Sequence, residues 1–145
     1  LPYKTHAGVQ FRHAAGKDAH APGFYLQLAP EGLFFGGGIW RPPNPQLNRI
    51  REFMVDNARS WSRIRNARSV KDAGGISGDR LQRPPRGFDP DHPHVEDLKL
   101  KSLYVMAEAP TDDALSASFI DQVDAAFRRA GPLNRFVCDA LELEF

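Results

Sequence analysis

The chain has 145 residues, of which 41% are hydrophobic and 26% charged, so it is long enough for one domain with a hydrophobic core and short for two. Its single cysteine, Cys138, excludes an internal disulfide and every cysteine-based zinc pattern, and we expect a buried thiol in a soluble, cytoplasmic protein. The net charge is only +1, but residues 1–71 carry a balance of +7 and residues 72–145 a balance of −6. The two halves can therefore pair with each other. No apolar run in the sequence approaches the roughly 18 residues that a membrane span needs.

The first 40 residues carry strand patterns. Loose alternation from Tyr3 to Arg12 predicts a half-buried strand, and a loop follows over residues 14–22. Two further alternating segments, 24–28 and 33–40, flank a turn at residues 30–32. Together they predict an antiparallel meander of three strands.

Three consecutive glycines, Gly36, Gly37 and Gly38, interrupt the second arm of the predicted hairpin. Glycine weakens a strand and packs no side chain, so a triplet predicts that something approaches the backbone closely. The sequence leaves three candidates open: a ligand, a neighbouring helix or a bulged partner strand.

A helix is predicted over residues 44–68, because Asn44 can cap it, Pro45 suits its first position, and apolar residues then recur at helical spacing. We expect this helix to lie on one face of the sheet. Its outer surface or its carboxyl end should be strongly basic, since it carries Arg49, Arg51, Arg59, Arg63, Arg65 and Arg68.

The second half begins with a proline-rich loop at 84–90 and a short helix at 93–98, followed by a strand at 103–107 that is apolar enough to be central. A helix then starts at residues 110–111, with a predicted buried stripe of Leu115, Phe119, Val123 and Phe127. Gly131 and Pro132 should end it, before a last helix over 133–141. The predicted class is α+β, a single domain over 1–145 in which an antiparallel sheet with a glycine-rich hairpin packs against helices.

Four ordered segments of this chain together resemble one known family: 3–8, 20–26, 36–42 and 85–93. They are similar to the bacterial and fungal family called domain of unknown function 2461. Members usually carry an amino-terminal helical region and an Arg-x-x-Arg-Asp-x-Arg-Phe segment before the Tyr-Lys-Thr that stands here at residues 3–5. The resemblance therefore implies a fragment or processed form, and it lends no established activity.

Polar residues from separate segments make up the candidate site. If the fold gathers the cationic ones around the glycines, fixed cations and exposed backbone N–H groups would suit a phosphate or carboxylate. We therefore expect a pocket for an anionic small molecule, catalytic or not, with no cofactor specified. Its candidate residues are Lys4, His20, Tyr25, Gly37, Arg41 and Arg86.

Two other readings remain open. The basic helix over 44–68 could bind a nucleic acid or an acidic protein, although no nucleic-acid recognition motif accompanies it. Alternatively, Asp89, Asp91 and His92 could hold a metal ion in a hydrolase, although His-Pro-His at 92–94 is not a zinc helix motif. No nucleophile elbow or phosphate-binding loop occurs in the sequence.

Overall fold

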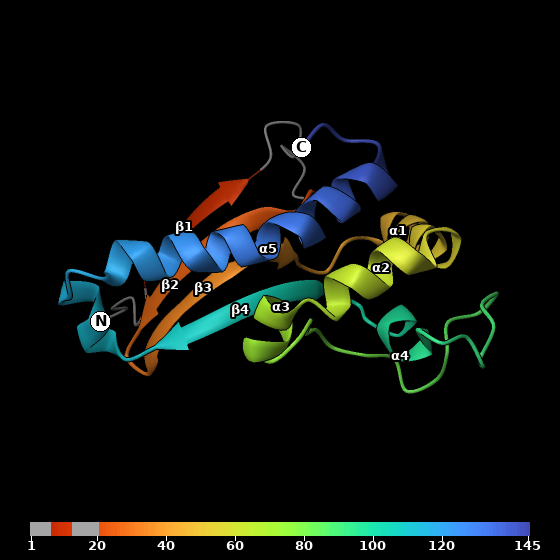
Figure 1. The fold of residues 1–145 in the computed structure, drawn as a ribbon. Helices are drawn as coiled ribbons and strands as arrows, with labels where there is room; N and C mark the ends of the chain where they lie inside the picture. The colour runs from red at the N-terminus through yellow and green to blue at the C-terminus, as the bar shows by residue number, and fades with distance from the viewer. Residues whose placement is uncertain (1–6, 13–20) are drawn as a thin grey trace, which may run out of the picture.

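The sheet is an antiparallel meander of four strands, seen in a computed structural model that describes residues 7–12 and 21–145, with side chains from residue 21 onward. The strands are β1 (Ala7–Arg12), β2 (Gly23–Ala29), β3 (Gly32–Ile39) and β4 (Leu103–Ala109), and they lie side by side in chain order (Figure 1). The predicted α+β class and the predicted meander are confirmed. The part of the first predicted strand before Ala7 lies outside the described residues.

The β2–β3 hairpin follows the sequence prediction closely. Leu28 pairs with Leu33 and Ala29 with Gly32, so Pro30 and Glu31 form a two-residue turn. Gly32 has a φ of 149°, a conformation that glycine adopts without a steric penalty. The turn fixes the register, and the register decides which side chains face the helices.

Strand β4 was predicted to be central, and that prediction was wrong, because β4 stands at the end of the strand order. Its outer edge is nevertheless partly paired. Ser77 donates from its N–H to the carbonyl of Tyr104 at 2.8 Å and accepts from the N–H of Tyr104 at 3.0 Å. This pairing and the burial of Leu103 and Val105 explain why an edge strand has the composition of a central one.

The glycine triplet lets two neighbours approach β3. A Cβ on Gly36 would lie 2.0 Å from the carbonyl oxygen of Val105, and one on Gly38 would lie 2.6 Å from the Cβ of Tyr104. On the opposite face, a Cβ on Gly37 would lie 2.9 Å from the Cβ of Ala130. Of the three candidates that the sequence left open, the helix is found at Gly37. At Gly36 and Gly38 the neighbour is β4, which pairs with β3 in unbroken register and is not bulged.

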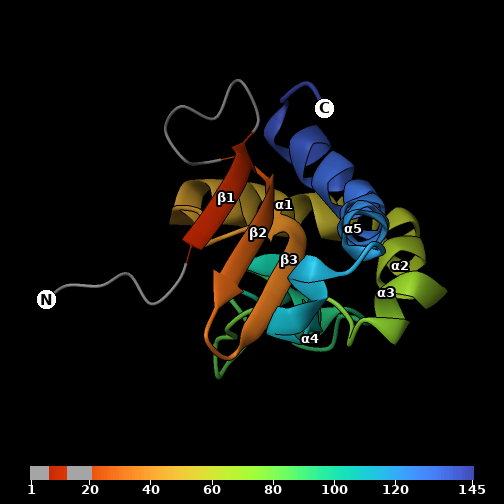
Figure 2. The same ribbon diagram turned by 90° about the vertical axis from the view of Figure 1, so that its left-hand side faces the viewer.

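Helix α5 (Phe119–Leu141) crosses one face of the sheet, as Figures 1 and 2 show. The prediction that Gly131 and Pro132 end a helix was wrong, since α5 continues through both. Ala130 and Leu133 are fully buried while Pro132 is exposed. Core packing therefore keeps the helix continuous on both sides of Pro132, and the proline ring faces solvent. Gly131 has no Cβ to collide with that ring, which removes one of the two clashes that usually restrict the residue before a proline.

A short 3₁₀ helix, η1 (Thr111–Leu115), precedes α5 where the sequence predicted the start of the long helix. Ser116 ends η1 in an extended conformation with a ψ of 152°. The break turns Leu115 into solvent, where it is 91% exposed, so its predicted place in the buried stripe was wrong. Phe119, Val123 and Phe127 do pack against the smaller apolar cluster, around Leu33, Phe35 and Ala126.

The helix predicted over 44–68 is divided into α1 (Asn44–Asp56) and α2 (Ala58–Arg65). Asn57 ends α1, because its backbone leaves the helical region, with a φ of −126° and a ψ of 44°. Its side-chain amide donates to the carbonyl of Phe53. Two short helices follow, α3 (Arg68–Asp72) and α4 (Val95–Leu98).

The main core lies where α1, α2 and the carboxyl half of α5 meet β4. It contains Trp61, Ile50, Met54, Leu103 and Val137, all at most 1% exposed. None of the helices in the described part of the chain has the length and apolarity to cross a membrane.

The space at Gly36 gives the first prediction. Gly36→Ala should lower the free energy of unfolding by about 3 kcal/mol or more, because the added methyl meets β4 backbone that cannot move aside. Gly74→Ala is the matched control: its site is open but its φ is 94°, so only backbone strain of about 1 kcal/mol is expected. Urea unfolding measures both, and equal losses would contradict the packing role of Gly36.

The buried thiol gives the second prediction. Burial, with a smaller contribution from Asp139, raises the pKa of Cys138 from 9.0 to about 11. The unfolded chain then loses this proton first, so the stability linked to the thiol is complete below about pH 9 and is lost as the pH rises toward 11. Wild type should therefore lose more stability than Cys138→Ala between about pH 8 and 10.5, in urea unfolding at each pH. Parallel pH profiles would contradict the assignment.

Candidate functional site

A cavity of about 530 Å³ lies where the end of β3, the start of α1 and the 79–86 segment meet. It brings together two of the predicted site residues, Arg41 and Arg86, which are 45 positions apart in the sequence. The described residues that line it are Arg41, Pro42, Asn44, Leu47, Asn48, Arg51, Asp79, Leu81, Pro85, Arg86 and Lys101.

Arg41 is held in an unusual backbone conformation, with a φ of 43°. Its N–H donates to the Oγ of Ser102 at 2.8 Å, and Ser102 is itself buried. Its guanidinium forms an ion pair with Asp79 at 3.3 Å, in which both side chains are largely exposed. A non-glycine residue at positive φ is strained, so the bond to Ser102 helps to fix where Arg41 leaves the sheet.

Arg86 projects from a tight turn in the proline-rich loop. The N–H of Phe88 donates to the carbonyl of Pro85 at 3.3 Å, and Gly87 has a φ of 89°, as the third position of a type II turn requires. Pro85 is buried against the cavity, whereas Arg86 is exposed. The turn therefore presents the guanidinium to solvent at the rim.

Arg51 contradicts the prediction that the arginines of residues 44–68 form an outer surface, because it is only 5% exposed. Its Nε donates to the carbonyl of Leu98 at 2.7 Å, one terminal nitrogen donates to the carbonyl of Leu100 at 3.2 Å, and the other donates to Asn48 Oδ1 at 3.1 Å. Burial lowers the pKa of Arg51 from its ordinary value. A guanidinium has five N–H donors, so two remain beyond these three bonds on a side chain that lines the cavity.

The amino terminus of α1 borders the same cavity through Asn44, Leu47 and Asn48. Within the described residues, no side chain caps this terminus, and its first turn contains no acidic residue. The prediction that Asn44 caps the helix was wrong, since Pro43 is the N-cap and Asn44 is the first helical residue. Pro43 and Pro45 have no N–H, so the N–H groups of Asn44 and Gln46 supply the partial positive charge that favours an anion there.

Lys101 and Asp79 enter the cavity from two segments that run side by side. Lys101 donates its N–H to the carbonyl of Asp79 at 2.7 Å, and Leu81 donates to the carbonyl of Lys99 at 2.8 Å. This short antiparallel pairing fixes both side chains relative to β4.

The charge of the cavity is unbalanced. Among its described lining residues, Arg41, Arg51, Arg86 and Lys101 are cationic and Asp79 is acidic. Cations beside an uncapped helix start are the chemistry that binds a phosphate or a carboxylate.

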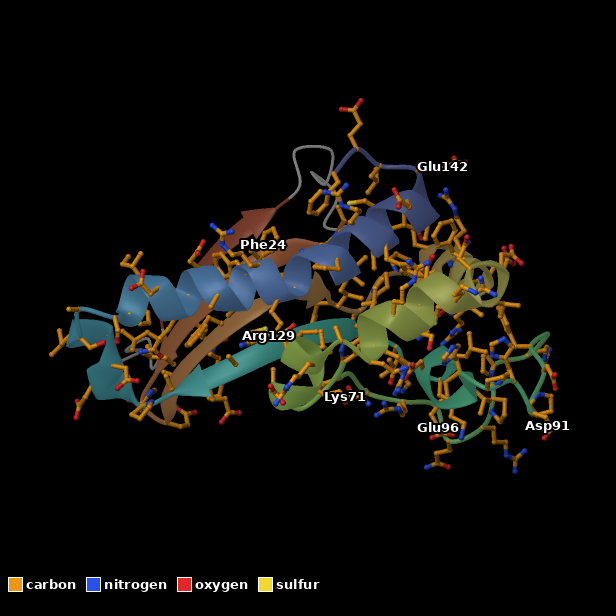
Figure 3. The ribbon with its side chains drawn as sticks, viewed as in Figure 1. Phe24, Lys71, Asp91, Glu96, Arg129 and Glu142 are labelled. Carbon is orange, nitrogen blue, oxygen red and sulfur yellow. The ribbon has the colours of Figure 1, made fainter. Side chains whose placement is uncertain are left out.

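The other predicted site residues are not part of this cavity. Lys4 and His20 lie outside the described residues. Tyr25 lies in the middle of β2, opposite Gly36, and does not line the cavity. Gly37 lies under α5, close to Phe24, whose ring contacts Phe127 at 5.2 Å between centroids where β2 passes behind the helix (Figure 3).

The residues of the metal alternative use some of their polar atoms in the local loop structure. Asp89 Oδ1 accepts from the N–H of Asp91, and Nδ1 of His92 accepts from the N–H of His94 at 3.0 Å. Asp91 lies at the outer edge of the molecule in Figure 3. Asp89 and His92 border a cavity of about 290 Å³ with Glu52 and Asp56. No group of three or more His, Cys, Asp and Glu within residues 21–145 could hold a metal ion.

Much of the basic charge between residues 44 and 68 is already paired. Arg49 contacts Glu142 at 3.5 Å, and Arg65 contacts the buried Asp97, which also accepts from Trp61. Together with Arg41–Asp79, these ion pairs join the basic first half of the chain to the acidic second half, as the charge distribution predicted. The continuous basic surface expected from the sequence is therefore reduced.

Sequence reasoning missed Arg51, Asp79 and Lys101 as parts of the site. One signal for Arg51 was available, because it falls on the same helical stripe as the apolar Leu47, Ile50 and Met54. An arginine on a buried stripe needs acceptors in the core. Asp79 and Lys101 carry no such local signal.

The comparison with family models identifies the family. Residues 1–136 match the family model described as conserved hypothetical protein (DUF2461), so the chain belongs to this family. Neither the search of curated proteins nor the search of solved structures returned a significant match.

The contacts of Arg51 predict a structural as well as an electrostatic role. Arg51→Met keeps most of the buried stem but leaves the carbonyls of Leu98 and Leu100 without these donors, so we expect a loss of about 2–4 kcal/mol in urea unfolding. Arg49→Met on the same helix removes an exposed ion pair and should change stability by less than about 0.5 kcal/mol. Equal effects of the two substitutions would contradict the role given to Arg51.

Proposed function

We propose that this protein binds a small anionic molecule, a phosphate or a carboxylate, in the cavity between α1 and the 79–86 segment. One observation carries the proposal: four cationic side chains from distant parts of the chain and the uncapped start of α1 border a single concave space.

Three features suit this role. Arg51 is held by core carbonyls, so its charge is positioned before any ligand arrives. Arg41 and Arg86 project from constrained backbone at the rim and can close on an anion as planar forks. Asp79 contacts Arg41 in an exposed pair, which contributes little stability and can open when an anion competes.

The arginines at the rim give a direct test. Arg86→Ala and Arg41→Ala should each weaken the binding of inorganic phosphate or pyrophosphate about tenfold or more in isothermal titration calorimetry, because each removes a charge-assisted contact. Arg59→Ala on α2 removes the same charge outside the cavity and should leave affinity nearly unchanged. Binding that is lost equally in all three variants would indicate a general charge effect and contradict the site.

A substitution that is expected to raise the affinity, rather than lower it, strengthens the test. Asp79→Asn removes the acidic competitor for Arg41 and should tighten anion binding. Affinity should also fall as salt rises, since part of the attraction is between exposed charges. Weaker binding by Asp79→Asn would argue that this carboxylate contacts the ligand as an acceptor, and the anion assignment would then fail.

A further inference from the structure

An exposed aromatic stack lies next in the chain to Arg41, which lines the cationic cavity. Trp40 and Tyr104 stack with ring centroids 5.0 Å apart and an angle of 29° between their planes. Trp40 is 57% exposed, an unusual state for so large an apolar ring. One of its faces is therefore fixed by Tyr104 while much of the ring remains available to solvent.

The glycine triplet creates the space for this stack. Tyr104 pairs with Gly38 across β3 and β4, and a Cβ on Gly38 would lie 2.6 Å from the Cβ of Tyr104. Any other residue at position 38 would displace Tyr104 and with it the surface on which Trp40 rests. Stacking limits the rotamers of Trp40, so a second ring can add to it at little cost in conformational entropy.

Both residues of the stack are linked through the backbone to residues that line the cavity. Trp40 immediately precedes Arg41, so their Cα atoms are about 3.8 Å apart. Tyr104 pairs through its backbone with Ser77, two residues before Asp79, and it follows Lys101 by three positions. The stack of Trp40 and Tyr104 and two of the cations, Arg41 and Lys101, thus lie at the same end of the β3–β4 pair, where β3 ends and β4 begins.

We infer that the anion bound in the cavity carries a planar ring that stacks on Trp40, as in an aryl phosphate or a nucleoside phosphate. This inference rests on the proposed function, which supplies the site for the charged end. Four cations and free helix N–H groups suit the charge and the several oxygens of a phosphate ester. An aromatic side chain can stack with a planar ring whatever its substituents, because every such ring presents a π face.

Intrinsic fluorescence can test this directly, because Trp40 and Trp61 are the only tryptophans and Trp61 is fully buried. Titration of the full chain with phenyl phosphate and with adenosine 5′-monophosphate should change the fluorescence of Trp40 and give tighter binding than ribose 5-phosphate or inorganic phosphate. The two ring-bearing probes separate an aryl phosphate from a nucleotide. In Trp40→Phe the remaining emission comes from Trp61 and should not respond.

The variants separate this inference from the proposed function. Trp40→Ala should weaken binding of the preferred ring-bearing phosphate by roughly tenfold, while its affinity for inorganic phosphate stays unchanged. Trp40→Phe, which keeps an aromatic face, should retain most of the affinity in calorimetry. If inorganic phosphate binds in an Arg86-dependent manner but a ring adds no affinity, the inference that a ring stacks on Trp40 is overturned and the proposed anion site stands. If no phosphate binds at all, both fall.

Discussion

Close approach of backbone to backbone at Gly36, Gly37 and Gly38 is the constraint on which the rest of this structure depends. A Cβ on Gly36 or Gly38 would collide with the adjacent strand β4, which includes Tyr104, and a Cβ on Gly37 would collide with Ala130 of α5. A side chain at any of these positions would separate the sheet from its neighbours, since the clashing atoms are largely backbone or are held in the core. The same close packing brings Tyr104 under Trp40. Glycine here serves packing, and through packing it shapes an exposed aromatic surface.

Arg51 joins the elements that surround the cavity, as the glycines join β3 to its neighbours. Its hydrogen bonds to Leu98 and Leu100 join α1 to the segment that leads into β4, so the element that carries the helix start and the element that carries Lys101 are fixed to each other. A buried charge is costly unless it is well bonded, and here backbone carbonyls supply the acceptors. Because these acceptors carry no full negative charge, the net charge of Arg51 remains to act on the cavity. Stability and anion attraction thus come from the same side chain.

Several elements could be predicted from local pattern, and the failures have a common cause. The β2–β3 hairpin followed from alternation and a Pro-Glu-Gly turn, and the start of α1 from a proline at an early helical position. The predicted helix stop at Gly131 and Pro132 failed because buried neighbours on both sides outweigh one lost backbone bond. The prediction for Leu115 failed because η1 packs against the smaller apolar cluster through Ala114 and leaves Leu115 in solvent. Propensity decided the outcome only where tertiary packing did not oppose it.

The sequence by itself determined the α+β class, the antiparallel meander, the family and two cations of the candidate site, Arg41 and Arg86, because each follows from residues that are neighbours along the chain or from an ordered set of motifs. Only the tertiary structure decided that Arg51 points inward, that Gly37 lies beneath α5, and that Lys101 and Asp79 border the same cavity as Arg86. These outcomes depend on contacts between segments tens of residues apart. Such contacts leave no periodic signal, because the residues that make them are brought together by the packing of the whole domain and not by their spacing in the chain.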